Sequence, residues 1–158
     1  GRLMETHGFK GTSEKGEEAA KSELLVLSEK PQFYEETIRE IRDCITEEKI
    51  IVTLAPGKTL DWLETQFGKK VKIVRTMPNT PALVGEGMTA ACPNQYVTEE
   101  EKKYVLQILG SFGKVEIVPE RMIDAVVAVS GSSPAYVFML IEAMAYPALA
   151  EGMLRTHA

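Results

Sequence analysis

The sequence predicts an α/β fold, in which a parallel sheet with crossover helices is followed by a helical region. Short runs rich in β-branched residues alternate with amphipathic helical patterns through most of the chain, as is typical of parallel strands joined by helices. From Met122 onward the pattern changes to helix after helix. Apolar residues make up 44% of the 158 residues and charged residues 26%, which indicates an ordinary folded protein and not a disordered one.

The first strand is expected at residues 24–27, a continuous apolar run typical of strands covered on both faces. Pro31 then ends it. Apolar side chains recur at spacings of four, three and four in the segment that follows, which predicts an amphipathic crossover helix. The residues that would form its buried face are Tyr34, Ile38, Ile41 and Ile45.

Two further strands are expected at residues 50–54 and 71–76. Between them, Thr59 is a candidate N-cap for a helix, and Gly68 is a candidate left-handed C-cap. Two prolines three positions apart predict a rigid, extended backbone over residues 77–81.

The next helix is predicted by the capping-box spacing of residues 98–101. Its expected buried stripe consists of Val105, Leu106, Ile108 and Leu109. A short strand should follow at residues 115–118. In the helical region, residues 130–134 are expected to form a break, an N-cap and a first-turn proline.

Composition also argues against several classes of function. The net charge of −5 disfavours a nucleic-acid partner, because such binding depends on Lys and Arg neutralising phosphates. Cys44 and Cys92 are isolated thiols, as expected in a reduced, cytoplasmic protein. His7 and His157 stand alone near the ends, so no metal site is predicted. The longest apolar run, residues 137–141, is far shorter than the ~20 residues that a membrane span requires, so no membrane association is expected.

Candidate ligand contacts lie where the chain leaves the predicted strands, because ligands of open parallel sheets bind beyond the carboxyl ends of the strands. These exits are residues 28–31, 55–57 and 77–81. Lys30 could bind a ligand or be a solvated loop lysine, and Asn79 could bind a ligand or cap its own turn. Glu120, at a further strand exit, could anchor a polar group or lie on the surface. No catalytic residue can be named, since no nucleophile, base and orienting group are recognisable together.

A family resemblance rests on several long motifs. The main one is the run at residues 74–88, VRTMPNTPALVGEGM, and the others are SFGKV at 111–115, DAV at 124–126 and SGSSPAYVF at 130–138. The sequence resembles pyrroline-5-carboxylate reductases in these motifs, which extend over most of the chain. The resemblance implies an incomplete Rossmann-type parallel sheet in residues 1–120 and the start of an all-α dimerisation domain in residues 121–158.

The resemblance also implies which residues contact a nicotinamide dinucleotide. The implied contacts are Ser28, Glu29, Lys30, Pro31, Leu54, Ala55, Pro56 and Glu120. Asn79 is added to this candidate set from its place at a strand exit. Glu29 stands where the family has valine, and we expect its charge to weaken cofactor binding by repelling the phosphates. Lys15 stands where the family often has asparagine, and it could meet a phosphate or point to water. Ser133 replaces the usual glycine, and Pro147 is expected to kink or end its helix early.

The implied activity is the reduction of 1-pyrroline-5-carboxylate to L-proline by hydride transfer from NADPH or NADH, in a cytoplasmic homo-oligomer formed through the helical region. The glycine-rich turn that opens the family's fold, and its later Ser-Pro-Gly-Gly-Thr-Thr-type substrate loop, have no counterpart in this sequence. An inactive truncated fragment or an assembly module without turnover therefore remains an alternative. A different dehydrogenase with a similar nucleotide-binding half is a third hypothesis.

Overall fold

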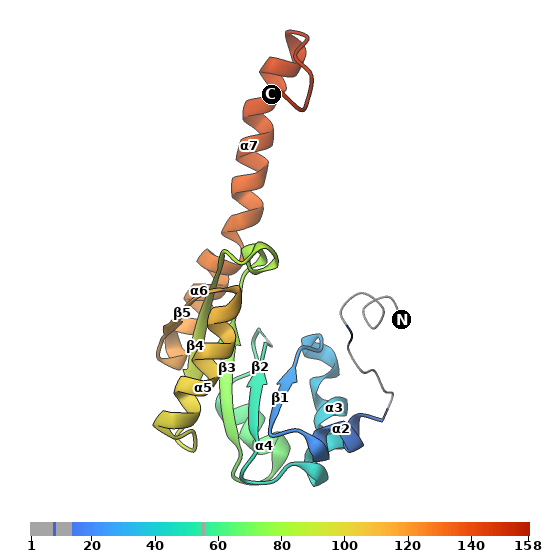
Figure 1. The fold of residues 1–158 in the computed structure, drawn as a ribbon, viewed down its shortest axis with the longest axis vertical. Helices are drawn as coiled ribbons and strands as arrows, with labels where there is room; N and C mark the ends of the chain where they lie inside the picture. Colours follow the sequence, from blue (N-terminus) through green and yellow to red (C-terminus); the bar gives the residue numbers. More distant parts are fainter. Residues whose placement is uncertain (1–7, 9–13, 55) are drawn as a thin grey trace. The chain divides into compact units, whose positions relative to one another are not determined.

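The computed structural model describes residue 8, residues 14–54 and residues 56–158 (Figure 1). In this part of the chain the strands form one five-stranded sheet in the order β1-β2-β3-β4-β5. The strands are β1 (Leu24–Leu27), β2 (Ile50–Thr53), β3 (Lys72–Met77), β4 (Gly87–Pro93) and β5 (Gly113–Ile117). The α-helices are α2 (Lys15–Lys21), α3 (Tyr34–Ile41), α4 (Leu60–Phe67), α5 (Glu99–Leu109), α6 (Ile123–Val126) and α7 (Ser133–Ala150). The predicted α/β fold with a helical end is confirmed.

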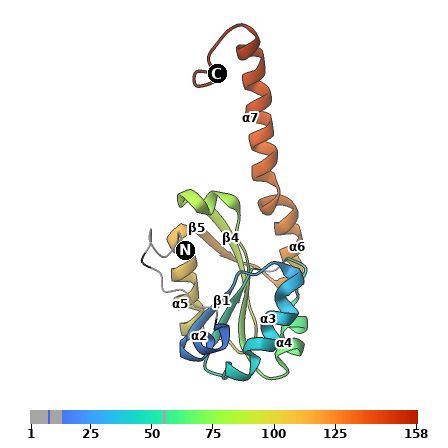
Figure 2. The same cartoon turned by 90° about the vertical axis from the view of Figure 1, so that its right-hand side faces the viewer.

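The described residues divide into two compact units, one that lies within residues 1–75 and 93–102 and one that consists of residues 76–92 and 103–158. In the first unit, β1, β2 and β3 are parallel and in register, with Leu24 opposite Ile50 and Ile50 opposite Lys72. Helices α3 and α4 lie side by side (Figure 2). The predicted buried face of the first crossover helix is confirmed for Tyr34, Ile38 and Ile41, which lie on α3 in the core of this unit. Ile45 is also in the core, but it is extended and follows a 3-10 turn (Arg42–Cys44), so it does not belong to the helix as predicted.

The expectation that the first strand is covered on both faces is wrong for Val26. Leu25 and Leu27 pack on the core that the helices build, and side chains alternate between the faces of a strand. Val26 therefore points to the other face, where it is 49% exposed. A continuous apolar run cannot reveal which of its alternate residues is left uncovered.

Local capping signals in the first unit are confirmed. The Oγ1 of Thr59 accepts a hydrogen bond from the backbone N of Trp62 at 3.1 Å, which caps α4. Gly68 ends the same helix with a left-handed φ of 66°. Thr98 and Glu101 form the predicted capping box, since the N of Thr98 donates to Glu101 Oε2 at 2.9 Å and the N of Glu101 donates to Thr98 Oγ1 at 3.3 Å.

The predicted buried stripe of α5 is only partly correct. Val105 and Leu109 are buried, one turn apart, but Ile108 is 37% exposed. Consecutive residues are about 100° apart around an α-helix, so Ile108 lies well to the side of Leu109.

The expected extended backbone over residues 77–81 is wrong at its end. Asn79 is extended, with φ −127° and ψ 168°, but a 3-10 helix begins at Thr80 and runs to Val84. Pro81 lies in the first turn of this helix, where backbone N–H groups have no acceptor within the helix, so the lack of an N–H in proline costs no hydrogen bond. Two close prolines therefore exclude a central strand here without excluding a helical start.

In the second unit, β4 and β5 are parallel, with Gly87 opposite Gly113. The helical segment contains a 3-10 turn (Glu120–Met122), α6, a π-helical stretch (Val127–Gly131) and α7. The expected break and N-cap at residues 130–134 are only partly correct. Ser132 is the residue before α7, but its backbone is in the right-handed helical region and its hydroxyl donates to the carbonyl of Val127 at 3.2 Å and does not cap α7. A single turn residue, Ser132, therefore separates the π-helical stretch from α7. Pro134 does lie in the first turn of α7, as predicted.

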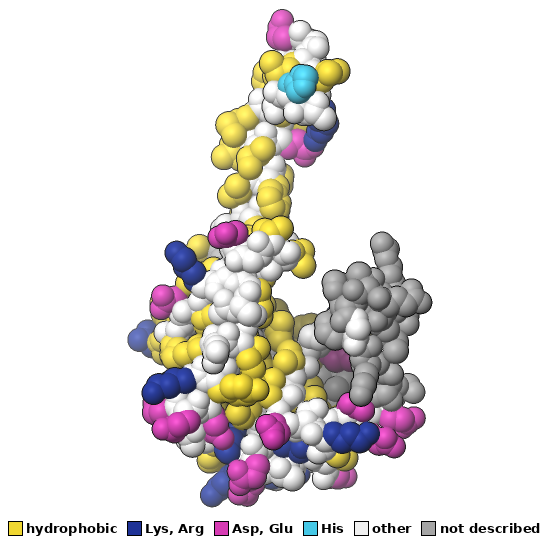
Figure 3. Space-filling model, viewed as in Figure 1, with side chains coloured by type: hydrophobic (Ala, Val, Ile, Leu, Met, Phe, Trp, Pro, Cys, Tyr) yellow, Lys and Arg dark blue, Asp and Glu magenta, His cyan; other side chains and the backbone are white. Residues whose placement is uncertain are grey.

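Helix α7 runs through Pro147 and ends at Ala150, less than one turn later. Figure 3 shows hydrophobic side chains along its surface. The exposed ones on this helix are Tyr136, Val137, Phe138, Met139, Leu140, Ile141, Met144 and Tyr146. By length and composition alone, the helical stretch 120–150 would suffice to cross a membrane, a property that the short run 137–141 had hidden. One such helix is weak support for a membrane span.

Candidate functional site

The candidate site in the first unit lies where β1 and β2 end. Leu27 is paired in register with Thr53, so the chain leaves both strands at the same edge of the sheet. The backbone N of Leu54 donates to the carbonyl of Leu27 at 3.2 Å, which extends the pairing by one step. The structure thus brings together two of the predicted segments, residues 28–31 and residues 54–56. Ala55 lies outside the described residues.

The side chains of this edge are mostly accessible. Ser28, Glu29 and Lys30 are exposed, and Pro31 begins a short 3-10 helix that ends at Phe33. Leu54 is half-buried and Pro56 is exposed. This edge lies beyond the carboxyl ends of two parallel strands and is mostly exposed, which suits the approach of a ligand.

The side chain of Tyr34 contacts the backbone at both strand ends. The sequence analysis predicted Tyr34 only as a core residue. Its hydroxyl donates to the carbonyl of Leu27 at 2.5 Å and accepts from the backbone N of Leu54 at 3.2 Å. Burial raises the pKa of Tyr34, so the hydroxyl stays neutral near pH 7. No local motif could reveal this, because the partners lie 7 and 20 residues away.

The charges near these exits have both signs. Lys15 forms an ion pair with Glu40 at 3.1 Å, and this contact raises the pKa of Lys15. Glu29 is near enough for its negative charge to contribute to the same shift. Lys15 therefore joins α2 to α3. The sequence analysis had considered only a phosphate contact or a side chain that points to water. Lys30 has no ion-pair partner among the described residues, so its ammonium group is available to an anionic ligand.

The residues at this edge fit one part of a dinucleotide. Gly57 has a left-handed φ of 74°, and a Cβ at this position would meet no atom within 4 Å, so the turn after β2 is open. Backbone groups and one available lysine can hold a phosphate or a carboxamide, while Glu29 opposes anionic groups. Over the residues the structure describes, no three His, Cys, Asp or Glu side chains are arranged to hold a metal ion.

In the second unit, the side chain of Asn79 hydrogen-bonds two other segments. Its Oδ1 accepts from the backbone N of Met88 at 2.8 Å, and its Nδ2 donates to the Oγ of Ser130 at 3.2 Å. The side chain thus links the exit of β3, the start of β4 and the π-helical turn. Sequence reasoning assigned Ser130 to a helix start and missed this contact, which spans 51 residues. One Nδ2 hydrogen remains for a further partner.

A cavity of about 360 Å³ adjoins Asn79 and Ser130. Ser133, the serine found where the family has glycine, lines it together with apolar side chains of α7. The remaining predicted residue of this unit, Glu120, is half-buried and begins the 3-10 turn before α6.

Comparison with known proteins agrees with the motifs. A family model described as pyrroline-5-carboxylate reductase dimerisation matches residues 120–158. The pyrroline-5-carboxylate reductase of Escherichia coli (strain K12) is 43% identical over 156 residues, which is 99% of this chain and 58% of that protein. The one of Arabidopsis thaliana is 35% identical over 153 residues, covering 97% and 55%. The chain therefore spans somewhat more than half the length of the curated relatives that it matches.

Solved structures give the same result. The pyrroline carboxylate reductase of Plasmodium falciparum, solved with NADP bound, superposes with a TM-score of 0.89 at 32% identity and covers 96% of this chain and 57% of its own. A prephenate dehydrogenase of Aquifex aeolicus gives a TM-score of 0.66 at 18% identity, over 92% of this chain and 58% of that one, a likeness of fold alone. The resemblance is confirmed: this chain is related to the pyrroline-5-carboxylate reductases in sequence and in fold.

Proposed function

We propose that this chain is part of a pyrroline-5-carboxylate reductase, an oxidoreductase that reduces 1-pyrroline-5-carboxylate to L-proline with NADPH or NADH in the last step of proline biosynthesis. The observation that carries the proposal is the 43% identity with the Escherichia coli enzyme over 99% of this chain. The NADP in the Plasmodium falciparum neighbour supports a nicotinamide dinucleotide as the cofactor.

The proposed cofactor contacts are Ser28, Glu29, Lys30, Pro31, Leu54, Ala55, Pro56, Asn79 and Glu120. The bound dinucleotide would supply the hydride, and the chain would hold and orient it. Lys30 is the proposed cationic contact, because it is exposed and has no ion-pair partner among the described residues. Glu29 would oppose the phosphates, by on the order of 1 kcal/mol.

The proposed assembly is a cytoplasmic homodimer formed through the helical region. The match of residues 120–158 to the dimerisation model supports this, and so do the exposed apolar side chains of α7. Apolar surface of this extent is typical of surfaces that bind another chain. Cys44 and Cys92 are not joined in a disulfide, which supports a reducing compartment. We retain the proposed boundary near residue 120 between a dinucleotide-binding part and a helical part.

The test has two stages with the purified chain. Binding of NADPH and of NADH is measured first, by calorimetry, with circular dichroism to confirm folding. 1-Pyrroline-5-carboxylate is then added, and loss of reduced cofactor and formation of proline are followed together. Matched loss of cofactor and gain of proline is the expected result. A folded chain that binds neither cofactor would contradict the proposal, whereas binding without turnover would support the alternative of a part that is not active alone.

A further inference from the structure

Tyr34 holds the ends of two parallel strands with a single oxygen atom. The residue begins α3 and is 1% exposed, and its ring packs in the core of the first unit. Its hydroxyl donates to the last carbonyl of β1, at Leu27, and accepts from the first amide after β2, at Leu54. Most of the proposed cofactor contacts are Leu54 itself or residues that immediately follow Leu27 and Leu54.

We propose that the Tyr34 hydroxyl is a positioning group for cofactor binding, which fixes the exits of β1 and β2 relative to each other so that both meet the same dinucleotide. The inference rests on the proposed function. Tyr34 is a positioning residue and not a catalytic one, because its hydroxyl contacts only backbone groups of the two exits.

Core packing by itself does not require the hydroxyl. Phenylalanine would fill the same apolar space, and a buried hydroxyl is unfavourable unless it is hydrogen-bonded. The backbone N of Leu54 already reaches the carbonyl of Leu27 at 3.2 Å, so β1 and β2 can remain paired without the tyrosine oxygen. What the oxygen adds is a second connection, from the start of α3 to both strand ends. This connection also limits the movement of residues 28–33, which lie between Leu27 and Tyr34.

The variant Tyr34→Phe removes the oxygen and keeps the ring. Dissociation constants for NADPH and NADH are measured by calorimetry, and exchange of the Leu54 amide is followed by hydrogen–deuterium exchange without cofactor. We expect Tyr34→Phe to weaken binding of the cofactor by about three- to tenfold and to speed exchange at Leu54 by a similar factor, as for the loss of one or two hydrogen bonds. If the chain turns over, KM for the cofactor should rise while kcat changes less than about twofold.

Two controls separate positioning from stability. Tyr104→Phe removes a hydroxyl from a tyrosine on α5 that is 51% exposed, and it should leave both readouts unchanged. Ile38→Val removes one buried methyl from α3 and loosens the same core without touching the strand exits. Equal weakening of cofactor binding by Ile38→Val and Tyr34→Phe would overturn the proposal, since it would reduce Tyr34 to a packing residue.

The remaining outcomes are also decisive. Unchanged exchange at Leu54 in Tyr34→Phe would show that the hydroxyl does not restrain the exits, and unchanged cofactor binding would show that the restraint has no functional effect. Either result overturns the inference while the proposed function stands. If the folded wild-type chain binds no nicotinamide dinucleotide, the proposed function fails first, and the positioning role fails with it.

Discussion

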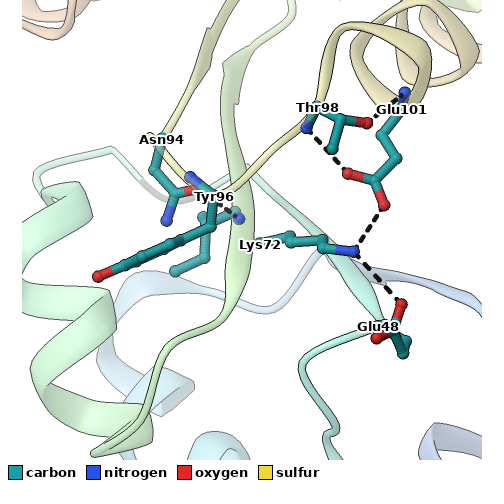
Figure 4. A network of polar contacts seen from close by, with 7 residues as sticks. Glu48, Lys72, Asn94, Tyr96, Thr98 and Glu101 are labelled. Atoms are coloured by element: carbon teal, nitrogen blue, oxygen red, sulfur yellow. Dashed lines mark hydrogen bonds and ion pairs between the residues drawn. The ribbon is translucent and has the colours of Figure 1, made fainter.

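The ammonium nitrogen of Lys72 lies 2.7 Å from the Oε1 of Glu101, joining β3 to the first turn of α5 (Figure 4). A second carboxylate, on Glu48, lies 3.7 Å from the same nitrogen. Lys72 and Glu101 are only 15% and 22% exposed, so water screens their attraction less than it screens most ion pairs of this chain. Glu101 is also the capping-box residue that accepts from the backbone N of Thr98. One carboxylate therefore supports both a helix start and a long-range contact.

The first prediction concerns the pH dependence of this contact. Burial of Glu101 acts to raise its pKa, but the hydrogen bonds from Lys72 and Thr98 outweigh it and hold the pKa below the ordinary value of 4.5. The contribution of Glu101 to stability is therefore fully present above about pH 4.5 and is lost as the pH falls through the lowered pKa. We expect Glu101→Gln to lower the free energy of unfolding by about 1 kcal/mol at pH 7, with a smaller effect at about pH 3.

Urea unfolding of wild type and Glu101→Gln at the two pH values checks this prediction. Glutamine can still complete a capping box, so the substitution removes the charge and largely spares the helix start. Glu100→Gln, at an exposed position in the same first turn, is the matched control. If the free energies of unfolding of wild type and Glu101→Gln differ by the same amount at both pH values, the stability does not depend on the charge of Glu101, and the prediction is wrong.

The second prediction concerns Asn94, a buried residue whose side chain is drawn in Figure 4 and makes four hydrogen bonds. Its amide accepts from two backbone N–H groups and donates to two oxygens; the partners are Ile73, Tyr96, Val71 and Glu64. Asn94→Ala leaves the N–H of Ile73 buried without this partner. We expect the free energy of unfolding to fall by about 2–3 kcal/mol, measured by thermal and urea denaturation. Gln95→Ala, at the exposed neighbouring position, should change it by less than about 0.5 kcal/mol, and comparable losses in the two variants would contradict this account.

The third prediction concerns the close approach of β4 and β5. Gly113 has a left-handed φ of 148°, and a Cβ added there would lie 2.0 Å from the carbonyl oxygen of Gly87. Gly113→Ala should therefore destabilise the second unit by more than about 3 kcal/mol or prevent soluble expression. Gly110→Ala, where a Cβ meets nothing within 4 Å, should change stability by less than about 1 kcal/mol. A melting temperature of Gly113→Ala equal to that of the wild type would disprove the close approach of Gly113 to Gly87.

The fourth prediction concerns self-association through α7. Ile141 is 54% exposed in the middle of this apolar helix. If α7 packs against a second copy, Ile141→Glu buries an unpaired charge in the interface and should convert the dimer to a monomer. Light scattering after size-exclusion chromatography measures the change. Tyr104→Glu, on the exposed face of α5, should leave the dimer intact. A wild-type chain that is monomeric at all tested concentrations would rule out this assembly.

Much of the fold was predictable because its signals are local. The cap at Thr59, the left-handed Gly68 and the capping box of Thr98 and Glu101 each depend on groups within four residues of one another. The spacing of Tyr34, Ile38 and Ile41 likewise predicts one helical face, whatever packs on it. At the candidate site, the exits of β1 and β2 were predictable for the same reason, since strand ends follow from the apolar runs.

The errors occurred where an outcome depended on distant segments. Val26 is exposed because nothing described covers its face of β1, and no property of residues 24–27 shows this. At residues 130–134 the helix start is at Ser133, as the residue types suggest, but the segment before it is a π-helical stretch that ends at Gly131 and not an irregular break. The cofactor contacts themselves remain predictions.

The sequence by itself determined the α/β class, most element positions, the helix caps and the family resemblance, because periodicity and capping act over a few residues. Only the tertiary structure decided that the Tyr34 hydroxyl joins Leu27 to Leu54, that Asn79 meets Ser130 and that Lys15 pairs with Glu40. The physical reason is that hydrogen bonds and ion pairs require partner atoms within about 4 Å, and for residues far apart along the chain that proximity exists only after strand register and helix packing are set.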